Sequence, residues 1–148
     1  MPRTNVTRRV PYPWQKLYAL VLDVESYPHF VPFCRKMVVL NRSSSGGMDQ
    51  LLAQMEVGFG VLRESYTSRI LGDPATREIN IASDDGPFRH LKGHWSFKPV
   101  NHEATEVHFE VEYAFRNPVV ALAVGKVFNT VFNEFVRAFE KRATDIFV

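Results

Sequence analysis

The last thirty residues, 118–147, constrain the fold of this 148-residue chain more than any other stretch. They begin with a proline, which is well tolerated in the first turn of a helix, and apolar residues then recur at helical spacing. One side of this predicted helix carries Val120, Val124, Phe128, Val131, Phe135 and Phe139, with Phe132 beside them. A single helix of this length would span about 40 Å and needs an extended partner surface. Because the chain before it is mostly strand-like, we predict an α+β fold in which a curved antiparallel sheet wraps around one long helix.

The opposite side of the predicted helix is apolar in its first turns and polar afterwards. Val119 and Leu122 lie there with Lys126 beside them. Exposed apolar residues next to a cation suit the boundary between water and lipid head groups. We therefore predict these three residues to be membrane-facing, and the alternative is that they contact the segment 27–33 or another molecule.

The preceding chain is divided by prolines and short turns into one helix, one irregular segment and several strands. Residues 4–10 alternate as a short strand, and a helix is expected from Pro13 to about Asp23. Residues 26–32 hold two prolines four positions apart, which one regular helix cannot contain, so we expect a short helical turn under the sheet. Strands are expected at 33–42, 48–59, 61–71 and 77–83. Two further strands alternate most clearly, with inward residues Leu91, Gly93, Trp95, Phe97, Val107, Phe109, Val111, Tyr113 and Phe115.

Charge and composition exclude some classes of protein and leave others open. The formal charge of +2 is too small to argue for nucleic acid, although Arg3, Arg8 and Arg9 precede the first acidic residue and form a basic edge that could meet phosphate. Ordinary surface charge is the alternative. A single cysteine excludes an internal disulfide framework. No apolar run is long enough to span a membrane, so we expect a cytoplasmic protein, with peripheral contact at the inner face of the membrane as a further option.

The residues that could carry catalysis do not form a recognisable set. On a strand, His90 and His94 would lie about 13 Å apart, which is too far for joint metal binding. Asp84 and Asp85 have the pattern of turn residues, and Cys34 has no visible histidine partner. We therefore expect a protein that is not an enzyme and has no catalytic residue, no metal and no catalytic cofactor.

The inward-facing aromatic residues are the remaining signal. Such a set is more often a packed core than a ligand pocket. Three features favour a cavity here: the length of the predicted helix, the glycines at 58, 60 and 93, and one inward-pointing carboxylate, Glu64. A buried carboxylate is rare without a partner. A structural hydrogen bond to the first helix or to Tyr66 is the plainer explanation for Glu64.

Four segments carry a resemblance to a known family: residues 23–33 (DVESYPHFVPF), 57–64 (VGFGVLRE), 86–88 (GPF) and 95–97 (WSF). They resemble the coenzyme Q-binding protein family, which also contains the bacterial ribosome association toxins, within the START-like polyketide cyclase and lipid transport superfamily. The resemblance runs from about residue 4 to residue 147, and a tryptophan is common in the family where this chain has Phe33. It implies a helix-grip fold and a hydrophobic tunnel that holds a polyisoprenoid quinone, supporting respiratory electron transport and quinone biosynthesis.

On this basis we expect one START-like lipid-binding domain over residues 1–148, monomeric, with ubiquinone as bound ligand. The residues expected at the ligand are Phe30, Val31, Phe33, Phe59, Glu64, Tyr66, Phe88, Trp95, Phe97, Val124, Phe128, Val131 and Phe135. Two alternatives stay open. One is a ribosome association toxin-like protein that binds the large ribosomal subunit, and the other is an enzyme of the aromatase/cyclase type.

Overall fold

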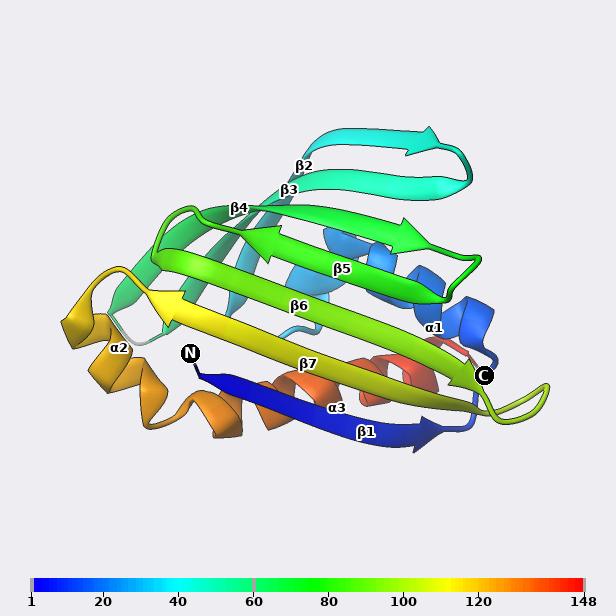
Figure 1. The fold of residues 1–148 in the computed structure, drawn as a ribbon. Coiled ribbons are helices and arrows are strands. Elements are labelled where there is room, and N and C mark those ends of the chain that lie inside the picture. The colour runs from blue at the N-terminus through cyan, green and yellow to red at the C-terminus, as the bar shows by residue number, and fades with distance from the viewer. Residues whose placement is uncertain (1, 60, 148) are drawn as a thin grey trace.

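Figure 1 gives the arrangement of the chain in the computed structural model, which describes residues 2–59 and 61–147 apart from the side chains of Phe59 and Leu62. Within these residues, seven strands form one antiparallel sheet in the order β1-β7-β6-β5-β4-β3-β2. The strands are β1 (Arg3–Val10), β2 (Cys34–Ser45), β3 (Met48–Phe59), β4 (Leu62–Asp73), β5 (Glu78–Ser83), β6 (Phe88–Pro99) and β7 (Thr105–Phe115). The helices are α1 (Trp14–Leu22), the 3₁₀ helix η1 (Val24–His29), α2 (Pro118–Gly125) and α3 (Phe128–Ile146).

The two faces of the sheet follow from the alternation in its strands. In β6 and β7, Trp95 pairs with Phe109, and both side chains are buried beneath the sheet. Their neighbours His94 and Glu110 also pair and lie on the outer face. Successive strand side chains point to opposite faces, so one face of the sheet is apolar and the other polar. The prediction of the inner faces of these strands is confirmed, and α1, η1 and α3 lie against the apolar face (Figure 1).

The segment that joins β1 to β2 closes one end of the apolar face. Pro13 is the N-cap residue of α1, whose buried side is formed by Leu17, Leu20 and Val21. The predicted short turn is η1, a 3₁₀ helix that contains Pro28. A 3₁₀ turn tolerates a proline that a continuous α-helix would not, because few of its N–H groups are needed for hydrogen bonds.

The C-terminal segment is two helices, which corrects the prediction of a single long one. The helices α2 and α3 are bent by 63° at a break after Gly125. Glycine is a poor helix former, and Gly125 has no neighbouring atom within 4 Å of the position of a Cβ, so packing does not hold the chain straight there. Consequently α2 stands away from the sheet at the opposite end from α1 (Figure 1).

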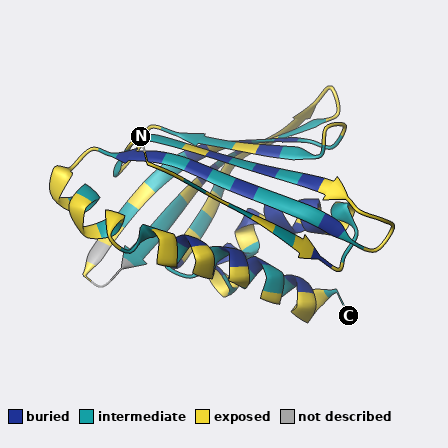
Figure 2. Cartoon of the chain, turned by 60° about the horizontal axis from the view of Figure 1, so that its bottom comes forward, coloured by how far each residue is buried: buried dark blue, intermediate teal, exposed yellow. Residues whose placement is uncertain are grey.

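The two C-terminal helices differ in burial. The inner side of α3 is Phe132, Val136, Phe139 and Ala143, which are all buried, whereas no residue of α2 is buried. Figure 2 shows this contrast, with α2 exposed and α3 turning one side to the sheet. No single helix in the described part of the chain is long and apolar enough to cross a membrane, and only α2 and α3 taken together meet a length and composition criterion.

Candidate functional site

The concave face of the sheet divides into a packed end and an end where apolar side chains stay partly exposed. The packed end lies between β6, β7, α1 and α3. We call its central rings the core cluster: Trp95, Phe97, Phe109, Phe132, Phe135 and Phe139. The ring centroids of Trp95 and Phe109 are 4.0 Å apart and those of Phe135 and Phe139 are 4.9 Å apart. These are contact distances, so the rings of the core cluster fill the space between sheet and helix.

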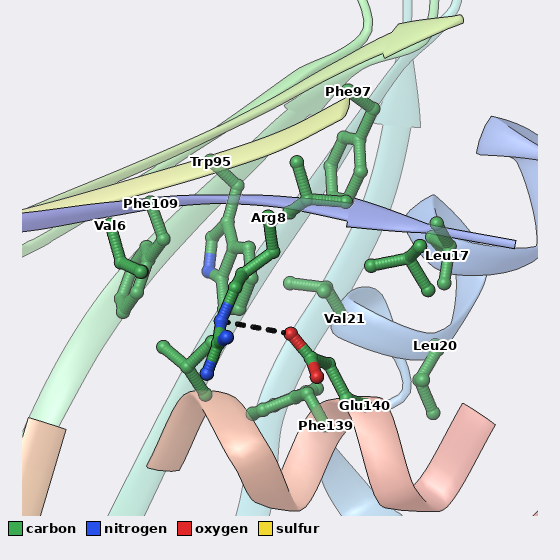
Figure 3. Close-up of a pocket in the computed structure, with 13 residues that line it drawn as sticks. Val6, Arg8, Leu17, Leu20, Val21, Trp95, Phe97, Phe109, Phe139 and Glu140 are labelled. Atoms are coloured by element: carbon green, nitrogen blue, oxygen red, sulfur yellow. Dashed lines mark ion pairs between the residues drawn. The ribbon is translucent and has the colours of Figure 1, made fainter. Parts of the chain in front are cut away.

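A cavity of about 30 Å³ lies beside the core cluster, under the edge strand β1. Figure 3 shows its lining, which is apolar apart from Arg8 and Glu140 at the mouth. This volume holds about two water molecules. The prediction that Phe30, Phe59, Trp95, Phe97, Phe128 and Phe135 surround a largely apolar internal cavity is therefore corrected for the described residues: the rings of the core cluster take up that space. The side chain of Phe59 lies outside those residues.

An ion pair closes the mouth of this cavity. Arg8 Nε on β1 lies 3.1 Å from Glu140 Oε1 on α3, and both side chains are about two-fifths exposed (41% and 37%). Behind it, the indole N–H of Trp95 is buried and finds no hydrogen-bond partner among the described residues. A buried donor of this kind is usually paired with an ordered water, and the cavity has room for one.

The other end of the concave face keeps apolar side chains partly exposed, although they point inward. We call this set the open apolar surface: Met37, Val39, Met55, Phe88, Leu91, Phe115 and Phe128. It is contributed by β2, β3, β6, β7 and the first turn of α3. These residues pack against the core without being covered by it. Solvent-accessible apolar area on the inside of a fold is what a hydrophobic ligand would cover.

A line of aromatic contacts crosses the open apolar surface from β4 to α3. The centroids of Tyr66 and Phe88 are 4.9 Å apart, and those of Phe88 and Phe115 are 5.1 Å apart. Phe115 then meets Tyr113 at 5.5 Å, and Tyr113 stacks on Phe128 at 3.9 Å. We call these five residues the ring ladder. It presents ring faces and edges along one surface, which suits a flat, unsaturated ligand.

Glu64 and Tyr66 are the half-buried polar residues of β4 on this face. Glu64 pairs with Val57 on β3, is half-buried, and makes no hydrogen bond or ion pair with the described residues. The predicted inward direction is confirmed. Desolvation raises the pKa of the Tyr66 hydroxyl above its ordinary value, with a smaller effect from Cys34. Burial also raises the pKa of the Cys34 thiol, to about 11, so this thiol is protonated and unreactive at neutral pH.

The predicted site residues other than Phe59 and Glu64 fall into three groups. Tyr66, Phe88 and Phe128 belong to the ring ladder, and Val124 and Val131 are half-buried on the neighbouring helices. Trp95, Phe97 and Phe135 belong instead to the core cluster. Near η1, Phe30 packs on Phe139 at 5.1 Å, Val31 is buried, and Phe33 accepts a hydrogen bond from the Gly58 N–H. Whether any of them touches a ligand stays a prediction.

Sequence reasoning left Met55, Tyr113 and Phe115 out of the predicted site, although the structure places them in it. The signal was present, because the alternation of β3 and β7 already put all three on the inner face. What alternation alone does not give is how far along a strand the helix covers that face. The break at Gly125 determines this, and it was not predicted.

The surface includes the predicted membrane-facing residues and the predicted basic edge. Val119 and Leu122 on α2 are 74% and 68% exposed, and Lys126 is exposed beside them. Along β1, two of the three arginines have acidic partners: Arg3 lies 3.3 Å from Glu112, and Arg8 pairs with Glu140 as described. The basic edge is therefore partly neutralised. His90 and His94 lie near separate carboxylates, and no three metal-ligating side chains meet among the described residues.

A curved antiparallel sheet that wraps around a C-terminal helix and has an apolar inner face is the helix-grip arrangement of START-like domains. The fold is that of a START superfamily protein from Mycobacterium smegmatis, with a TM-score of 0.82, 19% identity, and coverage of 97% of this chain and 98% of that one. The chain belongs to the family described as polyketide cyclase / dehydrase and lipid transport, which it matches over residues 10–140. The predicted fold class is thus confirmed.

Two relatives differ in what their names say. The chain is 34% identical over 149 residues to ribosome association toxin RatA of Escherichia coli, covering 99% of this chain and 90% of the relative. It is 28% identical over 144 residues to the mitochondrial coenzyme Q-binding protein COQ10 of Dictyostelium discoideum, covering 97% and 69%. Among solved structures, the ZhuI aromatase/cyclase from Streptomyces has a TM-score of 0.81 at 20% identity, with coverage of 97% and 93%. That last likeness shows the fold alone.

Proposed function

We propose that this protein binds a polyisoprenoid quinone, ubiquinone in the first instance, on the open apolar surface, and that it carries the quinone without catalysing a reaction. The observation that supports this most is the ring ladder, an inward-facing aromatic surface that the helices leave partly uncovered. A quinone ring would stack on it, and the isoprenoid tail would cover the aliphatic residues beside it. In this role the protein would serve respiratory electron transport and quinone biosynthesis.

The free energy of such binding depends on the apolar surface area that the ligand and the protein remove from water. Each Å² of apolar surface removed from water contributes about 25 cal/mol. A ligand that covers several half-exposed apolar side chains would therefore gain binding free energy from the apolar area that folding leaves in contact with water. A long apolar tail gains in the same way, which favours a prenylated ligand over a small polar one.

Helix α2 would bring this site to the membrane where such quinones reside. Its residues Val119 and Leu122 are exposed, and Lys126 follows them at the helix end. An apolar surface with an adjacent cation inserts into the head-group region of an anionic bilayer. Because the ring ladder ends at Phe128, directly after α2, a ligand leaving the bilayer would meet the open apolar surface first.

Extraction of the purified protein with organic solvent tests the proposal. We expect the extract to contain a quinone, recognised by an ultraviolet absorbance that falls on chemical reduction, together with a prenyl mass series. A matched preparation of the Phe115→Asp variant should contain much less, because a charge on the ladder must be desolvated when the ligand binds. Extracts without quinone from the wild-type protein, even after expression in a quinone-producing host, would contradict the proposal.

Ribosome association is the second candidate, and the likeness to RatA over nearly the whole chain favours it. On this hypothesis a basic edge would meet ribosomal RNA. The ion pairs of Arg3 and Arg8 with carboxylates weaken that surface, and Arg9 stays exposed on β1. Binding to ribosomal subunits should then fall steeply with salt and be reduced in an Arg8→Gln/Arg9→Gln variant. The aromatase/cyclase alternative rests on fold likeness at low identity and no particular residue set.

A further inference from the structure

The hydroxyl of Tyr66 has an unusual position on the open apolar surface. It lies on the inner face of β4, where its ring begins the ring ladder. Its only hydrogen bond with the described residues goes to the thioether sulfur of Met55, at 3.4 Å. Sulfur of this kind is a weak acceptor. The hydroxyl is therefore a donor that a better acceptor could recruit.

Two other phenols near this face already donate to oxygen acceptors. The Tyr18 hydroxyl donates to Asp49 Oδ2 at 2.9 Å, and the Tyr27 hydroxyl donates to the backbone carbonyl of Val21. Both acceptors are oxygen atoms, and both residues are buried. Tyr66 differs because it combines a weak partner with partial exposure on an apolar surface.

The backbone around Tyr66 is held from outside the strand, so the hydroxyl has a defined position. Asp85 accepts a hydrogen bond from the Thr67 N–H at 2.9 Å. In the same turn, Gly86 has a φ of +60°, and a Cβ at that position would lie 2.2 Å from the Ser65 carbonyl oxygen and 3.0 Å from Tyr66 Cβ. Only glycine permits this close approach. The turn before β6 therefore fixes β4 at the residue that begins the ladder.

We propose that Tyr66 is the residue that selects carbonyl-bearing ligands on the open apolar surface, by donating a hydrogen bond to a ring carbonyl oxygen. This inference rests on the proposed quinone binding and adds the group that orients the ring. A quinone stacked against Phe88 and Phe115 carries its oxygens at the ring edge, where a donor at the end of the ladder reaches one of them. The ligand oxygen replaces the Met55 sulfur, so no donor is left unpaired on binding.

The proposal predicts discrimination between ligands that share a tail and differ in ring oxygens. Decylubiquinone carries ring carbonyls, and phenyldecane has the same tail length on a ring without oxygen. A net hydrogen bond contributes a factor of about 2 to 13 in affinity. We therefore expect Tyr66→Phe to weaken decylubiquinone binding about fivefold and to leave phenyldecane binding within twofold of the wild type.

The control variant is Tyr12→Phe, which removes a phenol hydroxyl outside the open apolar surface and keeps the ring contact with Phe147. It should leave both affinities within twofold. Tyr66→Phe keeps the contact with Phe88 and loses one bond to sulfur, so we expect it to fold, and circular dichroism of each variant checks this.

The outcomes separate the two proposals. If wild-type protein binds neither ligand, the proposed function fails. If it binds both equally, or if Tyr66→Phe changes neither affinity or lowers both alike, quinone binding stands and the role of Tyr66 is overturned. Fivefold loss for decylubiquinone alone supports the role of Tyr66 as the selecting donor.

Discussion

At the scale of single residues, two phenylalanines on the same strand illustrate the difference between core and site. Phe97 is 2% exposed and stacks beside Trp95, whereas Phe88 is half-buried and lies in the ring ladder. Both point to the concave face of β6. The same residue type thus has a structural role near one end of the strand, and we assign it a binding role near the other.

Alanine at each position should separate these roles. Phe97→Ala removes a fully buried ring and is expected to lower the free energy of unfolding by about 3 to 5 kcal/mol. Phe88→Ala removes a ring that solvent already reaches, so about 1 to 2 kcal/mol is expected. The quinone affinity of the Phe88→Ala variant should fall about fivefold or more. The ligand loses a ring to stack on, and Tyr66 and Phe115 lose the ring that lies between them. Urea unfolding and a binding titration measure the two quantities. Equal stability loss from both variants would show that Phe88 belongs to the core.

At the scale of the elements, the strands and the helical character of residues 118–147 were predictable from sequence, and the break between α2 and α3 was not. Alternation in β6 and β7 identifies their inner faces because one face is apolar and the other charged. The stretch 118–147 shows apolar residues at helical spacing throughout, and that periodicity continues across Gly125. At Gly125 no neighbouring atom lies within 4 Å of the position of a Cβ, so packing does not hold the two helices in line there, and that packing is a property of the assembled structure.

The exposure of α2 leads to a prediction about membranes. Replacing Val119 and Leu122 with aspartate should leave the melting temperature within about 2 °C, because neither side chain is buried. Binding to anionic liposomes should fall at least tenfold, since both charges must be desolvated at the interface. Sedimentation with vesicles measures this, and Ile146→Asp, which alters an exposed apolar residue at the end of α3, is the matched control.

Two results would count against this account of α2. If the double aspartate variant unfolds, α2 packs on a surface that the protein needs. The second result has two parts: the double aspartate variant binds liposomes like the wild type, and Arg8→Gln/Arg9→Gln abolishes binding to ribosomal subunits. Together these would support ribosome association and contradict membrane contact through α2.

At the scale of the whole molecule, the helices cover the two ends of the concave sheet face unequally. The N-terminal segment and the second half of α3 close one end, with the Arg8–Glu140 ion pair across a cavity of about 30 Å³. At the other end the helix bends away and leaves the ring ladder partly uncovered. The order of elements and the aromatic content predicted that sheet and helix would enclose apolar side chains. Where those side chains pack and where they stay accessible depends on the bend, so the sequence predicted the face of the site and not its extent.

The central claim is that a quinone binds to the ring ladder on the concave face. The most direct measurement is an NMR titration of isotope-labelled protein with decylubiquinone in detergent, following the signals of Tyr66, Phe88, Leu91 and Phe115. We predict saturable shifts at these residues with a stoichiometry of one, and little change at His94 and Glu110 on the outer face. Shifts confined to the outer face or to β1, or no saturable shift at all, would contradict the claim.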